Sequence, residues 1–333
     1  MTGSSEDSLI AFGSLGGTIT MTPSRSSGGI EPRLSADDLL ASVPGLSELA
    51  VVRTETLSTI PGASLQPRDV LAAVDWARTQ VDEGASGVVL SQGTDTLEET
   101  SYLAELFWDR PEPLIFTGAM RGAAQLSADG PANVLAACHV ALSPQARGSG
   151  VLVVMDNIVH LASRVRKMHS TSLSAFQSPD GGAIGSVVEG AAWLRSNDRR
   201  GAPLPTPLRN PTVPVLETFL GDDGRLLRAL RGSGMDGMVI GAFGVGHVSA
   251  GLADEIASAT AEYPVVISTR TGHGGTLKST YEFAGSEIDV QRRGAILSGM
   301  LDARKSRLLL WALLSGNASR ERIISEFGER GER

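Results

Sequence analysis

The sequence predicts an α/β protein of two domains: a larger N-terminal domain with a mostly parallel sheet covered by helices, and a smaller C-terminal α/β domain. Short apolar runs alternate with longer amphipathic stretches, which is the pattern of βαβ units. The 39 glycines and 5% of aromatic residues favour many tight turns over an aromatic-rich sandwich core. The 333 residues also exceed the roughly 250 to 300 at which a single core stops growing.

Three pairs of a strand and a helix are expected in the first half of the chain. The strands cover residues 9–12, 88–90 and 114–116, and the helices that follow them cover 36–42, 97–108 and 132–142. A parallel sheet made from such pairs is covered on both faces, and its ligands bind beyond the carboxyl ends of the strands. Functional residues are therefore expected in the loops that follow the strands.

A proline-rich segment separates the two expected domains. It contains five prolines, none compatible with a helix interior. We expect an N-terminal domain over residues 1–196, a linker over 197–214 and a C-terminal domain over 215–333. The alternating pattern then resumes, with strands over 213–216, 237–240 and 265–267 and closing helices over 305–314 and 319–327. A Gly/Ser-rich segment over residues 23–29 is expected to be a mobile lid.

Composition excludes several classes of function. A net charge of -8 leaves no overall basic footprint for a nucleic acid, so nucleic acid is not an expected partner, although a local patch at Arg164, Arg166 and Lys167 stays open. No apolar run approaches the roughly 20 residues of a membrane span, and the N-terminus lacks the basic and apolar regions of a signal peptide. We expect a soluble cytoplasmic protein that does not bind a membrane.

Cysteine and histidine usage argues against disulfide and metal chemistry. The single Cys138 excludes an intrachain disulfide and lies in an Ala-rich stretch, where a buried, inert thiol is expected. The five histidines have no metal-ligand spacing, so each is by default a surface or core residue. Neither a metal nor an organic cofactor is expected.

The first candidate motif follows the first strand. Gly16 and Gly17 allow the backbone to approach a ligand closely, and Thr18 presents a hydroxyl at the end of the strand. An ordinary tight turn or a phosphate-binding turn would use similar residues. Neither GxGxxG nor GxxxxGK[ST] is present, however.

The second candidate motif runs from Ser91 to Thr100. Gly93 is followed by the hydroxyl of Thr94, the carboxylate of Asp95 and the hydroxyl of Thr96, directly before an expected helix. Capping of that helix explains one of the two threonines. It does not explain the whole cluster at a strand end, where main-chain N–H groups could also stabilise an oxyanion.

Together the two motifs resemble the two signatures of the bacterial L-asparaginase family. They read Gly16-Gly17-Thr18-Ile19 and Gly93-Thr94-Asp95-Thr96-Leu97-Glu98-Glu99-Thr100. Residues 117–121, 127–131 and 151–155 also resemble the family, and the similarity covers nearly the whole chain. The resemblance implies an amidohydrolase for linear amides that converts L-asparagine to L-aspartate and ammonia through a threonine nucleophile.

The resemblance also implies roles for individual residues. Thr18 matches the nucleophile, and a second catalytic group is matched by Thr94, Asp95 and Lys167. Ser64 matches the residue that binds the substrate α-carboxylate, and Asp95 also matches the residue that binds the α-ammonium. The main-chain carbonyl of Ala119 matches the one that approaches the reacting amide. N–H groups at Gly17 and Thr94 are expected to polarise the amide carbonyl. Which threonine attacks is left open, and without the resemblance Lys167 would be expected to be a solvated cation.

The chain departs from the family pattern at three places. Leu15 and Gln92 stand where the family usually has threonine and histidine, and Gly29 lies near the position of the lid tyrosine that activates the nucleophile. The resemblance implies a homo-oligomer, a dimer or tetramer, in which a neighbouring subunit completes each site. Tyr281 or Glu282 is the expected contribution in trans. Alternatively, Tyr281 and Phe283 pack the interface or the small domain while Glu282 faces water.

Other functions remain open. Glutamine is the nearest rival substrate, because one methylene changes discrimination by only about 1 to 3 kcal/mol. The asparaginase-like subunit of a tRNA-dependent amidotransferase is less expected, because the chain is acidic and no large extension precedes the first strand. A non-catalytic amino-acid sensor could keep Ser64 and Asp95, but it would need neither threonine nor Lys167.

Overall fold

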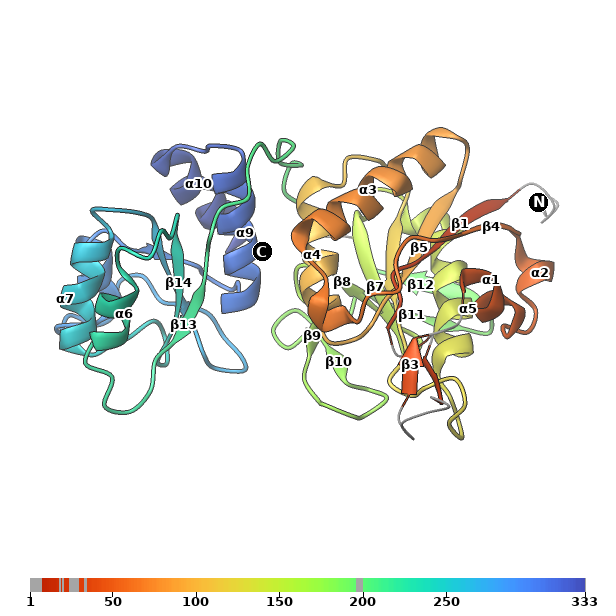
Figure 1. Cartoon of the computed structure of the whole chain (residues 1–333), viewed down its shortest axis with the longest axis horizontal. Helices are drawn as coiled ribbons and strands as arrows, with labels where there is room; N and C mark the ends of the chain where they lie inside the picture. Colours follow the sequence, from red (N-terminus) through yellow and green to blue (C-terminus); the bar gives the residue numbers. More distant parts are fainter. Residues whose placement is uncertain are drawn as a thin grey trace. The chain divides into compact units, whose positions relative to one another are not determined.

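The computed structural model describes residues 8–17, 19, 21–23, 30–32, 35–195 and 200–332. The chain divides into two compact units, Met1–Arg200 and Gly201–Arg333 (Figure 1). The N-terminal unit contains an eight-stranded sheet in the order β12-β11-β8-β7-β6-β5-β1-β4. Its strands are β1 (Leu9–Ser14), β4 (Val51–Thr56), β5 (Gly87–Ser91), β6 (Leu114–Thr117), β7 (Val151–Met155), β8 (Ile158–Leu161), β11 (Gly185–Val188) and β12 (Ala191–Leu194).

The five strands from β4 to β7 are parallel, whereas β8, β11 and β12 are antiparallel. Every residue of β5 and β7 is buried, which explains their valine-rich sequences. The antiparallel edge was not among the expected strands. All residues of β11 and β12 are half-buried or exposed, and Trp193 in β12 is 64% exposed, so an apolar run does not reveal these two strands.

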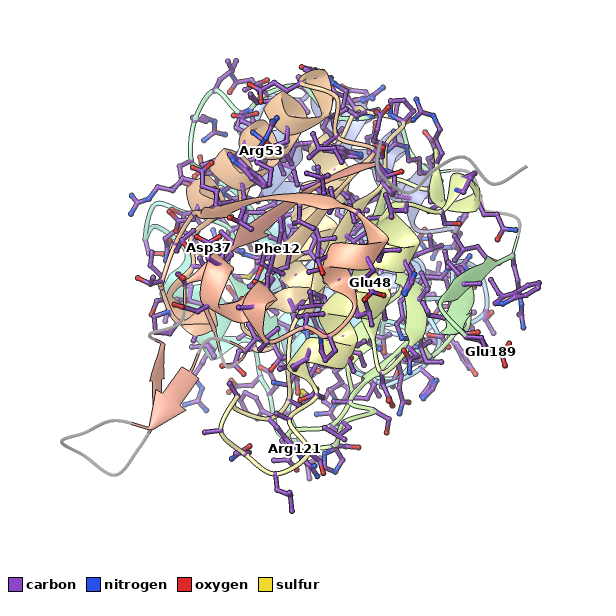
Figure 2. The ribbon with its side chains drawn as sticks, turned by 90° about the vertical axis from the view of Figure 1, so that its right-hand side faces the viewer. Phe12, Asp37, Glu48, Arg53, Arg121 and Glu189 are labelled. Atoms are coloured by element: carbon purple, nitrogen blue, oxygen red, sulfur yellow. The ribbon has the colours of Figure 1, made fainter. Side chains whose placement is uncertain are left out.

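Helices cover both faces of this sheet. Helices α3 (Pro67–Asp82) and α4 (Leu97–Phe107) lie on one face, and α1 (Ala36–Ala41) and α5 (Gly130–Ala141) lie on the other, with the short α2 (Leu46–Leu49) beside α1 (Figure 1). Figure 2 shows Phe12 of β1 inside the unit, with Arg53 and Glu189 at its periphery. Cys138 of α5 is fully buried, and burial raises the pKa of its thiol to about 12, so the expectation of an inert thiol is confirmed.

Several short elements complete the N-terminal unit. These are the antiparallel pairs β2 (Met21–Pro23) with β3 (Ile30–Pro32) and β9 (Arg166–Lys167) with β10 (Phe176–Gln177), and the 3-10 turns η3 (Gly62–Ser64) and η4 (Pro144–Ala146). Residues 24–29 of the expected lid lie outside the described residues.

The C-terminal unit has a four-stranded parallel sheet in the order β13-β14-β15-β16. The elements are β13 (Val215–Glu217), α6 (Arg225–Leu230), β14 (Met238–Ala242), α7 (Ala250–Ala259), β15 (Val265–Thr269), α8 (Glu287–Arg292), β16 (Ile296–Leu297), α9 (Ala303–Ser315) and α10 (Arg320–Arg330). Strand β13 begins after Pro214, two residues later than expected, because proline has no N–H to donate to a ladder. The predicted α/β class, with a larger, mostly parallel sheet and a smaller parallel sheet, is confirmed.

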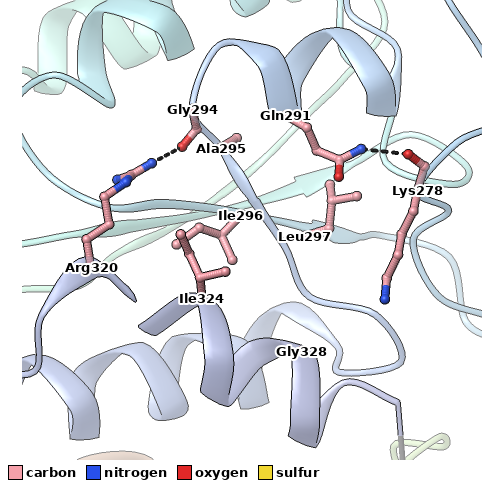
Figure 3. A pocket seen from close by; sticks show the side chains of 9 residues that line it. All are labelled: Lys278, Gln291, Gly294, Ala295, Ile296, Leu297, Arg320, Ile324 and Gly328. Carbon is pink, nitrogen blue, oxygen red and sulfur yellow. Dashed lines mark hydrogen bonds between the residues drawn. The ribbon is translucent and has the colours of Figure 1, made fainter. Parts of the chain in front are cut away.

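One pocket of the C-terminal unit lies between α10 and β16 (Figure 3). Ile296, Leu297 and Ile324 form its apolar surface. Its two cations already have partners: Arg320 donates to the carbonyl of Gly294, and Lys278 pairs with Glu332 at 2.8 Å. None of the site residues predicted from the sequence lines this pocket.

Candidate active site

The carboxyl ends of four parallel strands stand level at one edge of the large sheet. Ser14 of β1 is in register with Thr56 of β4 and Ser91 of β5, and Ser91 is in register with Thr117 of β6. The loops that follow these strands therefore start side by side. They carry Gly17, the 62–64 turn, Thr94 with Asp95, and Ala119, which come from four separate parts of the sequence.

Glycines allow three of these loops to touch through their backbones. Gly17 has φ +94°, and a Cβ placed on it would lie 2.1 Å from the Cα and N atoms of Gly93. A Cβ on Gly93 would in turn lie 3.1 Å from the Cα of Gly17 and 3.3 Å from the N atom of Gly62. A side chain at Gly17 would clash with the backbone of Gly93, and one at Gly93 would crowd its neighbours. The glycines thus bring the two sequence motifs into direct contact.

Lys167 is brought to the end of β5 from a distant part of the chain. Its Nζ donates a hydrogen bond to Thr94 Oγ1 at 2.8 Å and lies 3.1 Å from Asp95 Oδ1. The Lys167 side chain is only 17% exposed, whereas that of Asp95 is 69% exposed. The interpretation of Lys167 as a solvated cation therefore fails, and Asp95 retains an open face toward a ligand.

Two interactions place Lys167. Its strand β9 pairs with β10, where Lys167 is opposite Phe176, and its main-chain N–H donates to the carboxylate of Glu98 in the first turn of α4. Glu98 is 3% exposed. From the sequence, Glu98 had no role beyond its place in the second motif. Its second role depends on a partner 69 residues away, which no local pattern reveals.

Thr96 occupies the N-cap position of α4 but does not cap it through its side chain. The Thr96 hydroxyl donates instead to the carbonyl of Gly62 at 2.9 Å. The Thr94 hydroxyl is bonded to Lys167. Helix capping therefore explains neither threonine.

The loop that contains Ala119 is held by the start of α5. The carboxylate of Asp129 accepts the N–H groups of Met120 and Arg121, both at 2.9 Å, and Asn133 Nδ2 donates to the carbonyl of Gly118 at 3.0 Å. Ala119 is 1% exposed. The backbone around Ala119 is thus held by the half-buried Asp129 and the buried Asn133.

A small open pocket adjoins the Thr94 group. Asp95 and Lys167 line it together with the exposed residues 168–170.

No cluster of three or more acidic, histidine or cysteine side chains that could hold a metal ion occurs in the described ranges. No helix of that part of the chain is long and apolar enough to cross a membrane.

Comparison with known proteins identifies the family. The model of the asparaginase N-terminal domain matches residues 9–200, and the model of the glutaminase/asparaginase C-terminal domain matches residues 212–327. The chain belongs to the asparaginase family. The resemblance found in the two sequence motifs is therefore confirmed.

Individual relatives cover most of the chain. A probable L-asparaginase of Deinococcus radiodurans is 35% identical over 318 residues, which span 94% of each protein. An L-asparaginase of Bacillus licheniformis is 31% identical over 236 residues, 70% of this chain and 73% of the relative. The crystal structure of a probable cytoplasmic L-asparaginase from Campylobacter jejuni has a TM-score of 0.86 at 28% identity, covering 96% of this chain and 99% of that chain.

Within this asparaginase fold, the structure describes one of the two remaining predicted site residues, Ser64. Thr18, the expected nucleophile, lies outside the described residues, although its neighbours Gly17 and Ile19 are buried at the site. Ser64 is exposed at the end of the 62–64 turn, whose first residue contacts Gly93. The serine hydroxyl therefore belongs to the same loop cluster as Thr94.

Tyr281 lies in the other compact unit, in a segment with well-defined local contacts. The N–H groups of Tyr281 and Thr280 donate to the buried carboxylate of Glu287 at 2.6 and 2.7 Å, and His247 Nε2 lies 3.1 Å from the same carboxylate. Burial of Glu287 acts to raise its pKa, but these hydrogen bonds outweigh burial and lower it. The Tyr281 ring meets the His247 ring edge-on, yet Tyr281 stays 44% exposed.

Glu282, the other residue expected in trans, pairs with Arg292 at 2.7 Å. Both side chains are about two-thirds exposed. Such a surface pair is weak, so Glu282 could exchange Arg292 for another partner.

Proposed function

We propose that this protein hydrolyses the side-chain amide of L-asparagine to L-aspartate and ammonia, with Thr18 as nucleophile. The observation that carries this proposal is the 2.8 Å hydrogen bond between Lys167 Nζ and Thr94 Oγ1, beside the exposed carboxylate of Asp95. A hydroxyl bonded to an amine can take up or release a proton next to a bound amide. The names of the relatives agree with this substrate.

The reaction has two stages. The hydroxyl oxygen of Thr18 attacks the amide carbon, its proton passes to the leaving nitrogen through the groups at the site, and ammonia leaves an acyl-enzyme ester. Water then attacks the ester, which restores the Thr18 hydroxyl and releases L-aspartate. Backbone N–H groups near Gly17 and Thr94 stabilise the oxyanion, and Thr94 with Lys167 transfers the protons.

Recognition of the amino-acid head group fixes the amide in place. Asp95 binds the α-ammonium through its exposed carboxylate, and Ser64 binds the α-carboxylate from the 62–64 turn. The carbonyl of Ala119 approaches the reacting amide. No metal or organic cofactor takes part, because positioning and hydrogen bonds supply the catalysis.

Two finer parts of the proposal concern assembly. The protein is a cytoplasmic homotetramer, in which a C-terminal unit of one subunit completes the site of another. Tyr281 or Glu282 supplies the activating group that the chain lacks near Gly29. The ordered yet exposed segment at Tyr281 supports this proposal, because a preorganised surface loses less entropy on binding.

The test is release of ammonia from L-asparagine and from L-glutamine, with and without EDTA. We expect turnover of L-asparagine that EDTA does not change, and a fall in kcat of roughly 10²-fold or more for Thr94→Val and for Lys167→Met. Thr79→Val is a matched control, because its hydroxyl bonds only to its own helix. Zinc-dependent activity, or a Thr94→Val enzyme with unchanged kcat, would contradict the mechanism.

A further inference from the structure

A chain of hydrogen bonds behind the site starts at the fully buried amide of Gln92. Gln92 Oε1 accepts from the Thr100 hydroxyl at 2.7 Å, and Gln92 Nε2 donates to Thr96 Oγ1 at 3.1 Å and to the carbonyl of Gly93 at 3.3 Å. The family usually has a histidine at this position, and a neutral histidine ring has only one N–H donor. The Gln92 amide instead accepts one hydrogen bond and donates two at the same time.

The chain continues from Thr96 to the 62–64 turn. Thr96 Oγ1 accepts from Gln92 and donates to the carbonyl of Gly62 at 2.9 Å, across 34 residues of sequence. The orientation of the hydroxyl is fixed, because its single hydrogen points to Gly62 while a lone pair receives the Gln92 N–H. Gln92 and Thr96 therefore bind the turn to the end of β5.

This hydrogen-bonded connection sets the distance between the turn that carries Ser64 and the end of β5 that carries Thr94. Gly62 begins the turn that carries Ser64, while Gly93 directly precedes Thr94. The backbones of Gly62 and Gly93 already pack together, since a Cβ on Gly62 would lie 3.2 Å from the carbonyl oxygen of Gly93. The hydrogen bond from Thr96 to Gly62 opposes movement of the turn away from Thr94.

We infer that Gln92 and Thr96 are positioning residues that fix the spacing between the head-group site and the reacting amide, and so select asparagine over glutamine. The inference rests on the proposed function of Ser64 and Thr94. Neither Gln92 nor Thr96 contacts the reacting atoms. They act through the turn, which a tightly packed backbone holds at one position.

The test compares Thr96→Val with Thr96→Ser. Valine keeps the branched shape but loses the hydroxyl, and α4 loses no side-chain cap because Thr96 makes none. We expect Thr96→Val to raise KM for L-asparagine roughly 10-fold, to change kcat less than about threefold, and to lower the asparagine-to-glutamine ratio of kcat/KM roughly 10-fold. Thr96→Ser keeps the hydroxyl and should restore the wild-type values.

The matched control is Thr260→Val. The Thr260 hydroxyl also donates to a distant carbonyl, that of Arg293 at 2.7 Å across 33 residues, but it lies in the other unit. Its removal should leave both KM and the substrate ratio unchanged. Gln92→Met, which removes all three amide contacts, serves as a second variant should Thr96→Val fold poorly, and the same KM and ratio changes are expected. An unchanged substrate ratio in a folded variant overturns the inference.

Binding measurements separate this inference from the proposed function. If the wild-type protein releases no ammonia, the hydrolytic function fails. Calorimetric titration with L-asparagine and L-glutamine then still measures the selectivity of the site. A Kd ratio that falls roughly 10-fold in Thr96→Val supports the positioning role, and an unchanged ratio overturns it.

Discussion

Two nitrogen-bearing side chains of the N-terminal unit, Lys167 and His160, have opposite surroundings. Lys167 is partly exposed and bonded to Thr94 beside an open pocket. His160 of β8 is 3% exposed, and its Nδ1 lies 2.9 Å from Ser178 Oγ, while its Nε2 has no partner among the described residues. Burial lowers the pKa of His160 to about 4, so this histidine is neutral at pH 7 and belongs to the core.

His160 makes the protein sensitive to acid. As pH falls below 6.5, His160 becomes protonated in the unfolded chain, but in the folded protein it stays neutral until pH falls to about 4. The free energy of unfolding therefore decreases between these two pH values. The full loss is roughly 3 kcal/mol. Urea unfolding from pH 7.5 to 4.5 should show a steeper loss for the wild type than for His160→Asn, which keeps a polar partner for Ser178. Parallel pH profiles would contradict the assignment.

At the scale of elements, the carboxyl ends of the parallel strands determine where the site lies, because the loops that carry the site residues begin there. The sequence predicted β1, β5 and β6 and the helices that follow them, because apolar runs and amphipathic stretches alternate clearly there. It did not predict β4, whose residues are mostly exposed, or β9, which has only two residues. Yet β9 carries Lys167, and β4 leads into the 62–64 turn. Short or exposed strands are stabilised by their neighbours and leave little pattern in the sequence.

The contact between the two glycine motifs gives a prediction for Gly17. Alanine at this position would place a Cβ 2.1 Å from the Gly93 backbone and force the loops apart. We expect Gly17→Ala to lower kcat/KM by roughly 10²-fold or more, because displaced groups no longer meet the amide. Assays of purified, folded variants provide the measurement.

Gly84→Ala is the control for this prediction. Gly84 has φ +99°, close to the +94° of Gly17, but a Cβ there would meet nothing within 4 Å. The two variants share the strain of a left-handed backbone, which is roughly 1 to 2 kcal/mol. Only Gly17→Ala adds the backbone clash. Equal losses of activity in the two variants would show that strain, and not the loop contact, is responsible.

At the scale of the whole molecule, the proposed activating residue and the Thr94 group belong to different units. Tyr281 and Glu282 lie in Gly201–Arg333, whereas Thr94 and Lys167 lie in Met1–Arg200. The chain has three tyrosines in all, and none precedes Tyr102. The proposal under which Tyr281 or Glu282 comes from a second subunit therefore needs a direct test.

Mixing of subunits tests this completion. Thr18→Val and Glu282→Gln, or Thr18→Val and Tyr281→Phe, should each be inactive alone. In a mixed pair of subunits related by two-fold symmetry within the oligomer, one of the two sites combines the two intact residues. Random exchange should therefore restore about a quarter of the wild-type activity. Native mass spectrometry measures the exchange, and ammonia release measures the activity. A fully active monomer, or exchanged oligomers that remain inactive, would rule out completion in trans.

The sequence by itself determined the α/β class, the family and the residues of both glycine-threonine motifs, because these depend on local periodicity and on residue types at fixed spacing. Only the tertiary structure decided which of these residues contact each other. The bonds from Lys167 to Thr94 and from Thr96 to Gly62 join residues 73 and 34 positions apart. Such contacts depend on strand register and on loops that pack backbone against backbone, and neither leaves a local pattern that identifies the partner.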